Sequence, residues 1–480
     1  GGGYFNESWG FFGLQSVESS ANFNSRLYMG TGVTTPGAAM VWEYDGSTWS
    51  VVGGQGVRGS WAADTYENVF TLQSFGGDLY AGLGSTGNDA EVWRYNGTSW
   101  TQVGGDSLNS SWAAGFETVN ALTPYQGQLY AGLGNSANDA EVWRYNGTTW
   151  SKVGGDSLNS GWTTNYETVQ TMTVLDGQLY AGLGNSTGDA EVWRYNGTSW
   201  TKVGGDGASG SWNIGYEEVF AMRVFDGRIY AGLGNGTGDA EIWSYDGTAW
   251  ALVGGDGVNS SWPDGTYERV RSMAVYNGEL FVGIGDSTGD GDVWRFDGTT
   301  WEKIGGSGLN NGWTSSIEYV STLIDYRGKL YAGTGNTVNA DAVIWSYGNN
   351  GYLSSDQTVQ DTSWHHIAAT FDGTTMRLYI DGQLDSSASA TLSIDTNSLP
   401  LKIGSTYGSG GRGEAQGFFK GQIDEARISN NVRPSFTTRP YSTTPQSIAL
   451  SAPALTSGIE SYQGFLAAEA PNGGSITYRL

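Results

Sequence analysis

The stretch LYAGLGNSTGDAEVWRYNGTSWTKVGGDGASGSWNIGYEEVFAMRVFDG, residues 179–227, decides the fold. It contains four short runs in which apolar and polar residues alternate: LYAGLG, AEVWRY, SWTKVGG and YEEVFAMRVF. Gly, Asn and Asp residues separate these runs. Alternation bounded by turn residues indicates β-strands, because successive side chains of a strand point to opposite faces. The stretch therefore predicts four consecutive strands and no helix.

The same unit recurs along most of the chain. LYAGLG or a close variant begins at Leu27, Leu79, Leu129, Leu179, Ile229, Leu280 and Leu330, with spacings of 52, 50, 50, 50, 51 and 50 residues. Four strands in a repeat of this length are typical of a propeller blade. We therefore expect an all-β protein with a seven-bladed β-propeller over residues 1–360. The fourth strand of the seventh blade is expected at Gly351–Val359.

Two resemblances extend this interpretation. The turn Tyr245-Asp246-Gly247-Thr248-Ala249-Trp250 and its counterparts resemble kelch-type and related lectin-type propeller repeats. Farther along, SWHHIAATFDGTTMRLYIDGQ (363–383), LKIG (401–404) and FFKGQIDEARIS (418–429) resemble the second half of a laminin-G/concanavalin A-like domain. That resemblance implies a partial lectin-like β-sandwich, or jelly roll, over residues 361–433. Residues 434–480 are rich in Ser, Thr and Ala and are expected to form an extended tail with short strands.

Composition excludes several classes of function. The formal net charge is −25, which disfavours nucleic acid and anionic membranes as partners, because both attract basic surfaces. Cysteine is absent, so disulfides, zinc–thiolate sites and thiol catalysis are excluded. The only histidines are His365 and His366, which excludes Ser–His chemistry over most of the chain. No apolar run is long enough to suggest insertion into a membrane.

Two loops of each repeat are expected on one face of the ring. Strands of a blade alternate in direction, so the loop after LYAGLG and the long loop after SWTKVGG open on the same side. The long loops supply tryptophans, and the other loops supply carboxylates. The predicted ligand-binding residues are Trp112, Trp162, Trp212, Trp262, Asp139, Glu141, Asp189, Glu191, Asp239 and Glu241. Indole faces beside carboxylates suit sugars, because rings stack on C–H faces and carboxylates accept from hydroxyls.

Three interpretations of this face remain open from the sequence. In the structural one, each loop tryptophan packs between blades and each Glu pairs with a basic residue such as Lys202. In the second, the face is a multivalent glycan site. In the third, calcium is bound by Asp286, Asp290 and Asp292, which offer the oxygen ligands that a hard cation prefers.

The resulting functional expectation is an extracellular or cell-surface protein of binding or adhesion, not an enzyme. Its expected partners are glycans or cell-surface and matrix components, and near-identical repeats favour avidity. Nothing in the repeats singles out one carboxylate pair for glycoside hydrolysis. The alternative is a structural subunit of a surface layer or filament. In that case a homo-oligomer would assemble by strand complementation, because an incomplete jelly roll offers unpaired strand edges.

Overall fold

The computed structural model describes residues 14–348 with gaps, residues 364–389 and a few positions between 406 and 436. The gaps are 33–38, 63–65, 85–88, 137, 164, 185, 187, 235–238, 264, 311, 314 and 337–341. The strand predicted at Gly351–Val359 and nearly all of the predicted tail at 434–480 lie outside the described residues.

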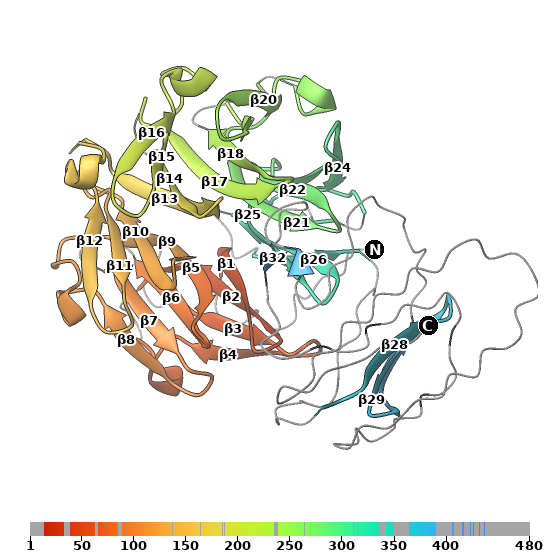
Figure 1. Ribbon diagram of the computed structural model, residues 1–480. Coiled ribbons are helices and arrows are strands. Elements are labelled where there is room, and N and C mark those ends of the chain that lie inside the picture. The colour runs from red at the N-terminus through yellow and green to blue at the C-terminus, as the bar shows by residue number, and fades with distance from the viewer. Residues whose placement is uncertain are drawn as a thin grey trace, which may run out of the picture.

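The first part of the chain is a propeller of seven blades, as the repeat predicts (Figure 1). Consecutive strands of each blade pair antiparallel. Blade one contains β1 (Ser16–Phe23), β2 (Arg26–Gly32), β3 (Val41–Tyr44) and β4 (Trp49–Gly53). Blade two contains β5 (Asn68–Phe75), β6 (Asp78–Gly84), β7 (Glu91–Tyr95) and β8 (Trp100–Gly104). Blade three contains β9 (Thr118–Tyr125), β10 (Gln128–Gly134), β11 (Val142–Tyr145) and β12 (Trp150–Gly154).

The remaining blades repeat this order. Blade four contains β13 (Thr168–Leu175), β14 (Gln178–Gly184), β15 (Glu191–Tyr195) and β16 (Trp200–Gly204). Blade five contains β17 (Glu218–Phe225), β18 (Arg228–Gly234), β19 (Ile242–Tyr245) and β20 (Trp250–Gly254). Blade six contains β21 (Val270–Tyr276), β22 (Glu279–Ile284), β23 (Asp292–Phe296) and β24 (Trp301–Gly305). The described strands of blade seven are β25 (Tyr319–Tyr326), β26 (Lys329–Gly335) and β27 (Ile344–Tyr347).

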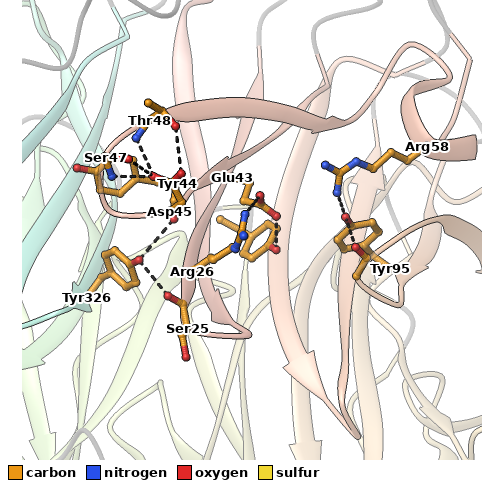
Figure 2. Close-up of polar contacts among 12 residues, drawn as sticks. Ser25, Arg26, Glu43, Tyr44, Asp45, Ser47, Thr48, Arg58, Tyr95 and Tyr326 are labelled. Carbon is orange, nitrogen blue, oxygen red and sulfur yellow. Dashed lines mark hydrogen bonds and ion pairs between the residues drawn. The ribbon is translucent and has the colours of Figure 1, made fainter. Parts of the chain in front are cut away.

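A short 3-10 turn follows the fourth strand of each of the first five blades. These turns are η1 (Val57–Gly59), η2 (Leu108–Ser110), η3 (Leu158–Ser160), η4 (Ala208–Gly210) and η5 (Val258–Ser260). In the first of them, the Arg58 guanidinium donates to the Tyr95 hydroxyl of the next blade (Figure 2). The turn thus joins the outer parts of two blades.

A close contact between neighbouring blades explains the glycine of the LYAG motif. A Cβ placed on Gly182 would lie 2.8 Å from Cγ1 of Val219, a fully buried residue on the innermost strand of the next blade. Only a residue without a side chain lets the two backbones approach this closely. The equivalent pairs are Gly30–Val69, Gly82–Val119, Gly132–Val169, Gly232–Val270, Gly283–Val320 and Gly333–Val17.

The last of these pairs closes the ring between blades seven and one. Ser16 of β1 also pairs with Gly335 of β26. The Ser321 hydroxyl donates to the carbonyl of Val17. Figure 2 shows a second bond at this junction, in which the Tyr326 hydroxyl donates to the carbonyl of Ser25 at 3.0 Å. The seventh junction therefore repeats the glycine–valine packing of the other six, and the ring has seven sectors.

The C-terminal described residues form small antiparallel sheets. β28 (Ile367–Phe371), β29 (Thr375–Ile380) and β30 (Gln383–Ser389) make one sheet, and β31 (Thr406–Tyr407) pairs with β32 (Ala415–Gln416). His365 Nδ1 lies 2.7 Å from Asp381 Oδ2, and Asp381 also accepts the backbone N–H of His366 at 2.9 Å. Within the described part of the chain, no helix is long and apolar enough to span a bilayer.

The glycine–valine contact gives a direct test of the fold. We expect Gly182→Ala to lower the free energy of unfolding by about 1–3 kcal/mol, because the added methyl group overpacks the junction against Val219. The control is Gly215→Ala, whose Cβ would meet nothing within 4 Å. Urea denaturation of both variants and the parent measures the difference. Equal stability of the two variants would contradict a close-packed junction.

Candidate functional site

In the structure, the loop after LYAGLG and the long loop after SWTKVGG lie side by side, as the strand directions predict. The Trp162 indole N–H donates to the carbonyl of Ala140 at 2.7 Å, and Ala140 directly precedes Glu141. The same bond joins Trp112 to Ala90, Trp212 to Ala190 and Trp262 to Ala240, each at 2.7 Å. Indoles and carboxylates therefore meet on one rim of the ring.

The indoles are nevertheless unavailable to a ligand, so their assignment as stacking platforms is wrong. Trp112 and Trp162 are 1% exposed, and Trp212 and Trp262 are 2% exposed. Trp162 packs edge-on against Trp193 and Trp200 of the following blade, with centroid distances of 5.9 and 5.1 Å. The physical reason is that each indole bridges two blades: it donates to one and packs its ring on the next. These tryptophans belong to the core of the junctions.

The predicted glutamates are also structural. Glu141, Glu191 and Glu241 are buried. Glu141 accepts the Trp143 indole N–H at 2.6 Å and forms an ion pair with Lys152, and Glu191 does the same with Trp193 and Lys202. Burial raises the pKa of Glu141, while its bonds to Lys152 and Trp143 lower it in part. Buried carboxylates with internal donors hold the blade together and are not free to accept from a ligand.

The predicted aspartates lie closer to the surface. Asp139, Asp189 and Asp239 are half-buried. Burial first, and then the charges of Glu117, Glu141 and Asp156, raise the pKa of Asp139 to about 6. The pKa of Asp189 rises to about 6 through burial and three equivalent carboxylates. Glu117 itself accepts from Asn135 at 3.0 Å and from Ser136 at 2.8 Å. The charged form is therefore disfavoured at Asp139 and Asp189, and the tryptophan rings of these loops are buried.

The three aspartates predicted to bind calcium do not converge. Asp286 pairs with Arg269 and Arg271, whereas Asp292 is buried and pairs with Tyr267 and with Lys303 at 2.5 Å. Burial and the neighbouring Glu268 raise the pKa of Asp290 to about 6. Among the described residues, no group of three Asp, Glu or His side chains is placed to hold a metal ion. Asp286 and Asp292 therefore form ion pairs with basic side chains and do not form a calcium site with Asp290.

The structure contains a different candidate site, at one mouth of the central channel. A cavity of about 250 Å³ lies among the innermost strands, and its accessible lining is mainly polar. Six of the seven innermost strands contribute to it: β1, β5, β13, β17, β21 and β25. Its charged and aromatic lining residues are Glu18, Phe70, Phe220 and Arg271. All four are partly accessible.

Arg271 is held in a defined position at this mouth. Its Nε donates to the carbonyl of Gly285 at 3.1 Å, and its terminal nitrogen pairs with Asp286. The guanidinium lies over the ring of Tyr319, 4.2 Å from the centroid. Arg269, beside the cavity, shares Asp286 at 2.9 Å and lies over Phe220 at 4.8 Å. Stacking and pairing on fixed partners pre-organise the remaining N–H groups of Arg271.

A buried carboxylate accompanies the two arginines. Glu218, which opens β17, is 6% exposed. Burial raises its pKa to about 7, although the charges of Arg269 and Arg271 act to lower it. The mouth therefore combines two guanidinium groups with Asp286 and Glu218.

The sequence did not predict this site, because the candidate residues were sought at positions that recur in every repeat. The equivalent first-strand positions hold Glu18, Phe70, Asn120, Gln170, Phe220, Arg271 and Ser321. The valine that precedes them is the same in every blade, while this position differs between most of the blades. A variable position on the innermost strand was the signal that could have indicated the site.

The raised pKa of the rim aspartates predicts how stability changes with pH. The folded-state pKa of Asp139, about 6, lies above that of an aspartate in an unfolded chain. Its stabilising contribution is therefore complete below about pH 4 and is lost as the pH rises through about 6. We expect Asp139→Asn to stabilise the protein at pH 7.5, by on the order of 1 kcal/mol after allowance for solvent screening.

Denaturation at pH 7.5 and pH 4.5 tests this expectation, since the gain from Asp139→Asn should shrink at the lower pH. The control is Asp246→Asn. Hydrogen bonds from Thr248 and from the Ala249 N–H lower the pKa of Asp246 to about 2, so its carboxylate is favoured and its removal should give no gain. A gain from Asp139→Asn that is the same at both pH values would contradict the assignment.

Comparison with known proteins gave one family match. A model of the concanavalin A-like lectin/glucanase superfamily matches residues 313–435, which include 361–433 and also β25–β27. No curated protein matches the sequence significantly. Among solved structures, U3-55K is 12% identical, with a TM-score of 0.45 over 69% of this chain and 95% of that chain. A chain of the mitotic checkpoint complex is 15% identical, with a TM-score of 0.43 over 70% of this chain and 90% of that chain. The chain thus combines a seven-bladed β-propeller with a C-terminal segment similar to concanavalin A-like lectins.

Proposed function

We propose that the protein is a non-enzymatic carbohydrate-binding protein that acts outside the cell. Its propeller would bind one sugar residue at the mouth of the central channel. The single observation that carries this proposal is the polar cavity of about 250 Å³ at the place where the repeat is broken. The burial of the loop tryptophans argues for one site per ring in place of a multivalent rim.

The residues at the mouth suit a sugar. Each sugar hydroxyl both donates and accepts, so a sugar site needs donors and acceptors together. Arg271 supplies N–H donors, and Glu18 supplies carboxylate acceptors. Phe70 supplies a partly accessible aromatic ring for C–H groups, whereas the Phe220 ring is engaged by Arg269. A cavity of this size accommodates a small ligand, such as one sugar ring at the end of a glycan, and not an extended chain.

The composition of the cavity favours binding over hydrolysis. Glycoside hydrolysis requires two carboxyl groups that flank the scissile bond. Glu18 is the one carboxylate among the described lining residues. The lectin-like match over 313–435 supports a binding role and an extracellular location, since such domains often occur outside cells.

Replacement of Arg271 tests this site. We expect Arg271→Gln to reduce binding of the full chain to a glycan array at least about tenfold, because the fixed donor of the mouth is lost. Arg144→Gln is the control, since Arg144 lies on β11 and does not line the cavity. Melting curves verify that both variants fold. Unchanged binding by a folded Arg271→Gln variant would contradict a channel-mouth site.

A second candidate function is assembly into a surface layer or filament. One observation favours it: the residues around the β28–β30 sheet expose large apolar side chains, with Trp364 46%, Ile367 55% and Leu384 54% exposed. Large exposed apolar side chains are typical of surfaces that associate with other proteins.

Self-association can be measured directly. If the sheet mediates assembly, Ile367→Ser combined with Leu384→Ser should convert oligomers into monomers in light scattering coupled to size exclusion. Ile214→Ser is the control, because Ile214 is 71% exposed on a propeller loop. A parent chain that is monomeric at high concentration would remove this candidate.

A further inference from the structure

One carboxylate at the channel mouth, that of Glu18, is not engaged by the arginines there, and this bears on the ligand. Arg269 and Arg271 share Asp286, and the buried Glu218 lies close enough for both arginines to act on its pKa. Of these two carboxyl groups, only Asp286 forms ion pairs with the arginines. Glu18 remains as an additional negative charge at the same mouth.

Glu18 is open toward the cavity. Its side chain is partly accessible and lines the cavity, and within the described part of the chain no hydrogen bond or ion pair engages its carboxylate. The charge of Glu18 helps to raise the pKa of Arg271, but the two side chains do not form an ion pair. A carboxylate without such a partner attracts a cation.

An aromatic ring accompanies this carboxylate. Phe70 occupies on β5 the position that Glu18 occupies on β1, and these two strands are neighbours around the channel. A carboxylate beside an aromatic ring suits an ammonium group, because both the charge and the ring face attract a cation. Arg271 lies on β21, which β25 separates from β1, and it offers donors to neutral oxygens.

We propose that the ligand of the channel mouth is an amino sugar. Its ammonium group binds Glu18 and the face of Phe70, and its hydroxyl oxygens accept from Arg271. This inference rests on the proposed function and names the class of sugar. The strongly acidic chain, with its net charge of −25, further favours a cationic ligand over an anionic one.

Calorimetry of the full chain with methyl glycosides tests the proposal. At about pH 6.5 and low salt, methyl glucosaminide should bind at least about tenfold more tightly than methyl glucoside. Its N-acetyl derivative, which has no charge, should lose this advantage. Added salt should reduce the preference, because screening weakens an attraction between opposite charges.

Variants assign the preference to named residues. Glu18→Gln should abolish the preference for the amine over the neutral sugar, and Phe70→Leu should weaken this preference. The control is Glu117→Gln, a rim carboxylate outside the cavity, which should leave the preference unchanged. Preference that survives in folded Glu18→Gln, or equal binding of amino and neutral sugars by the parent, would overturn the inference.

The remaining outcomes separate the two proposals. If no sugar binds the parent chain, the proposed function fails as a whole. If neutral sugars bind and the amino sugar has no advantage, only the amino-sugar inference fails. If free lysine binds as tightly as methyl glucosaminide, the site recognises an amine without a sugar, and the inference is again overturned.

Discussion

The contact between a glycine of one blade and a valine of the next is the constraint on which the propeller depends. It recurs at all seven junctions, including the one that joins the last blade to the first. The valines are fully buried, and the glycines leave no room for a methyl group. This contact sets how near the second strand of one blade comes to the innermost strand of the next, and so it fixes where the innermost strands stand around the axis of the ring. The cavity at the channel mouth is therefore a consequence of the same packing.

A second layer of contacts lies farther out and uses aromatic rings. In the six described junctions that have a loop tryptophan, its indole N–H bonds to the preceding blade. Its ring then packs on tryptophans of the following blade, as Trp212 does on Trp243 and Trp250. In a repeat protein, what recurs in every unit serves the interface between units. Function is better sought where the recurrence stops, as it does at Arg271.

Much of the fold followed from the sequence, because the spacing of LYAGLG and the turn residues set blade number and strand order. The meeting of the two loops on one rim followed from alternating strand direction. The burial of the indoles could not be predicted, because Trp162 is covered by Trp193 and Trp200 of the next blade, 31 and 38 residues farther along the chain. The pairing of Asp286 with Arg269 and Arg271 was equally out of reach, since it depends on how the β22–β23 loop folds back on the start of β21.

The closure of the ring also has a consequence for synthesis of the chain. The Ser321 hydroxyl and the Val17 carbonyl, which meet at the closing junction, are separated by 304 residues. A ribosome adds about 5–20 residues per second, so β1 emerges about 15–60 s before its neighbour exists. During that interval the first blade has an uncovered flank with Val17 at its surface. Nascent chains therefore pass through an open crescent, the stage at which a chaperone or a neighbouring nascent chain competes for that flank.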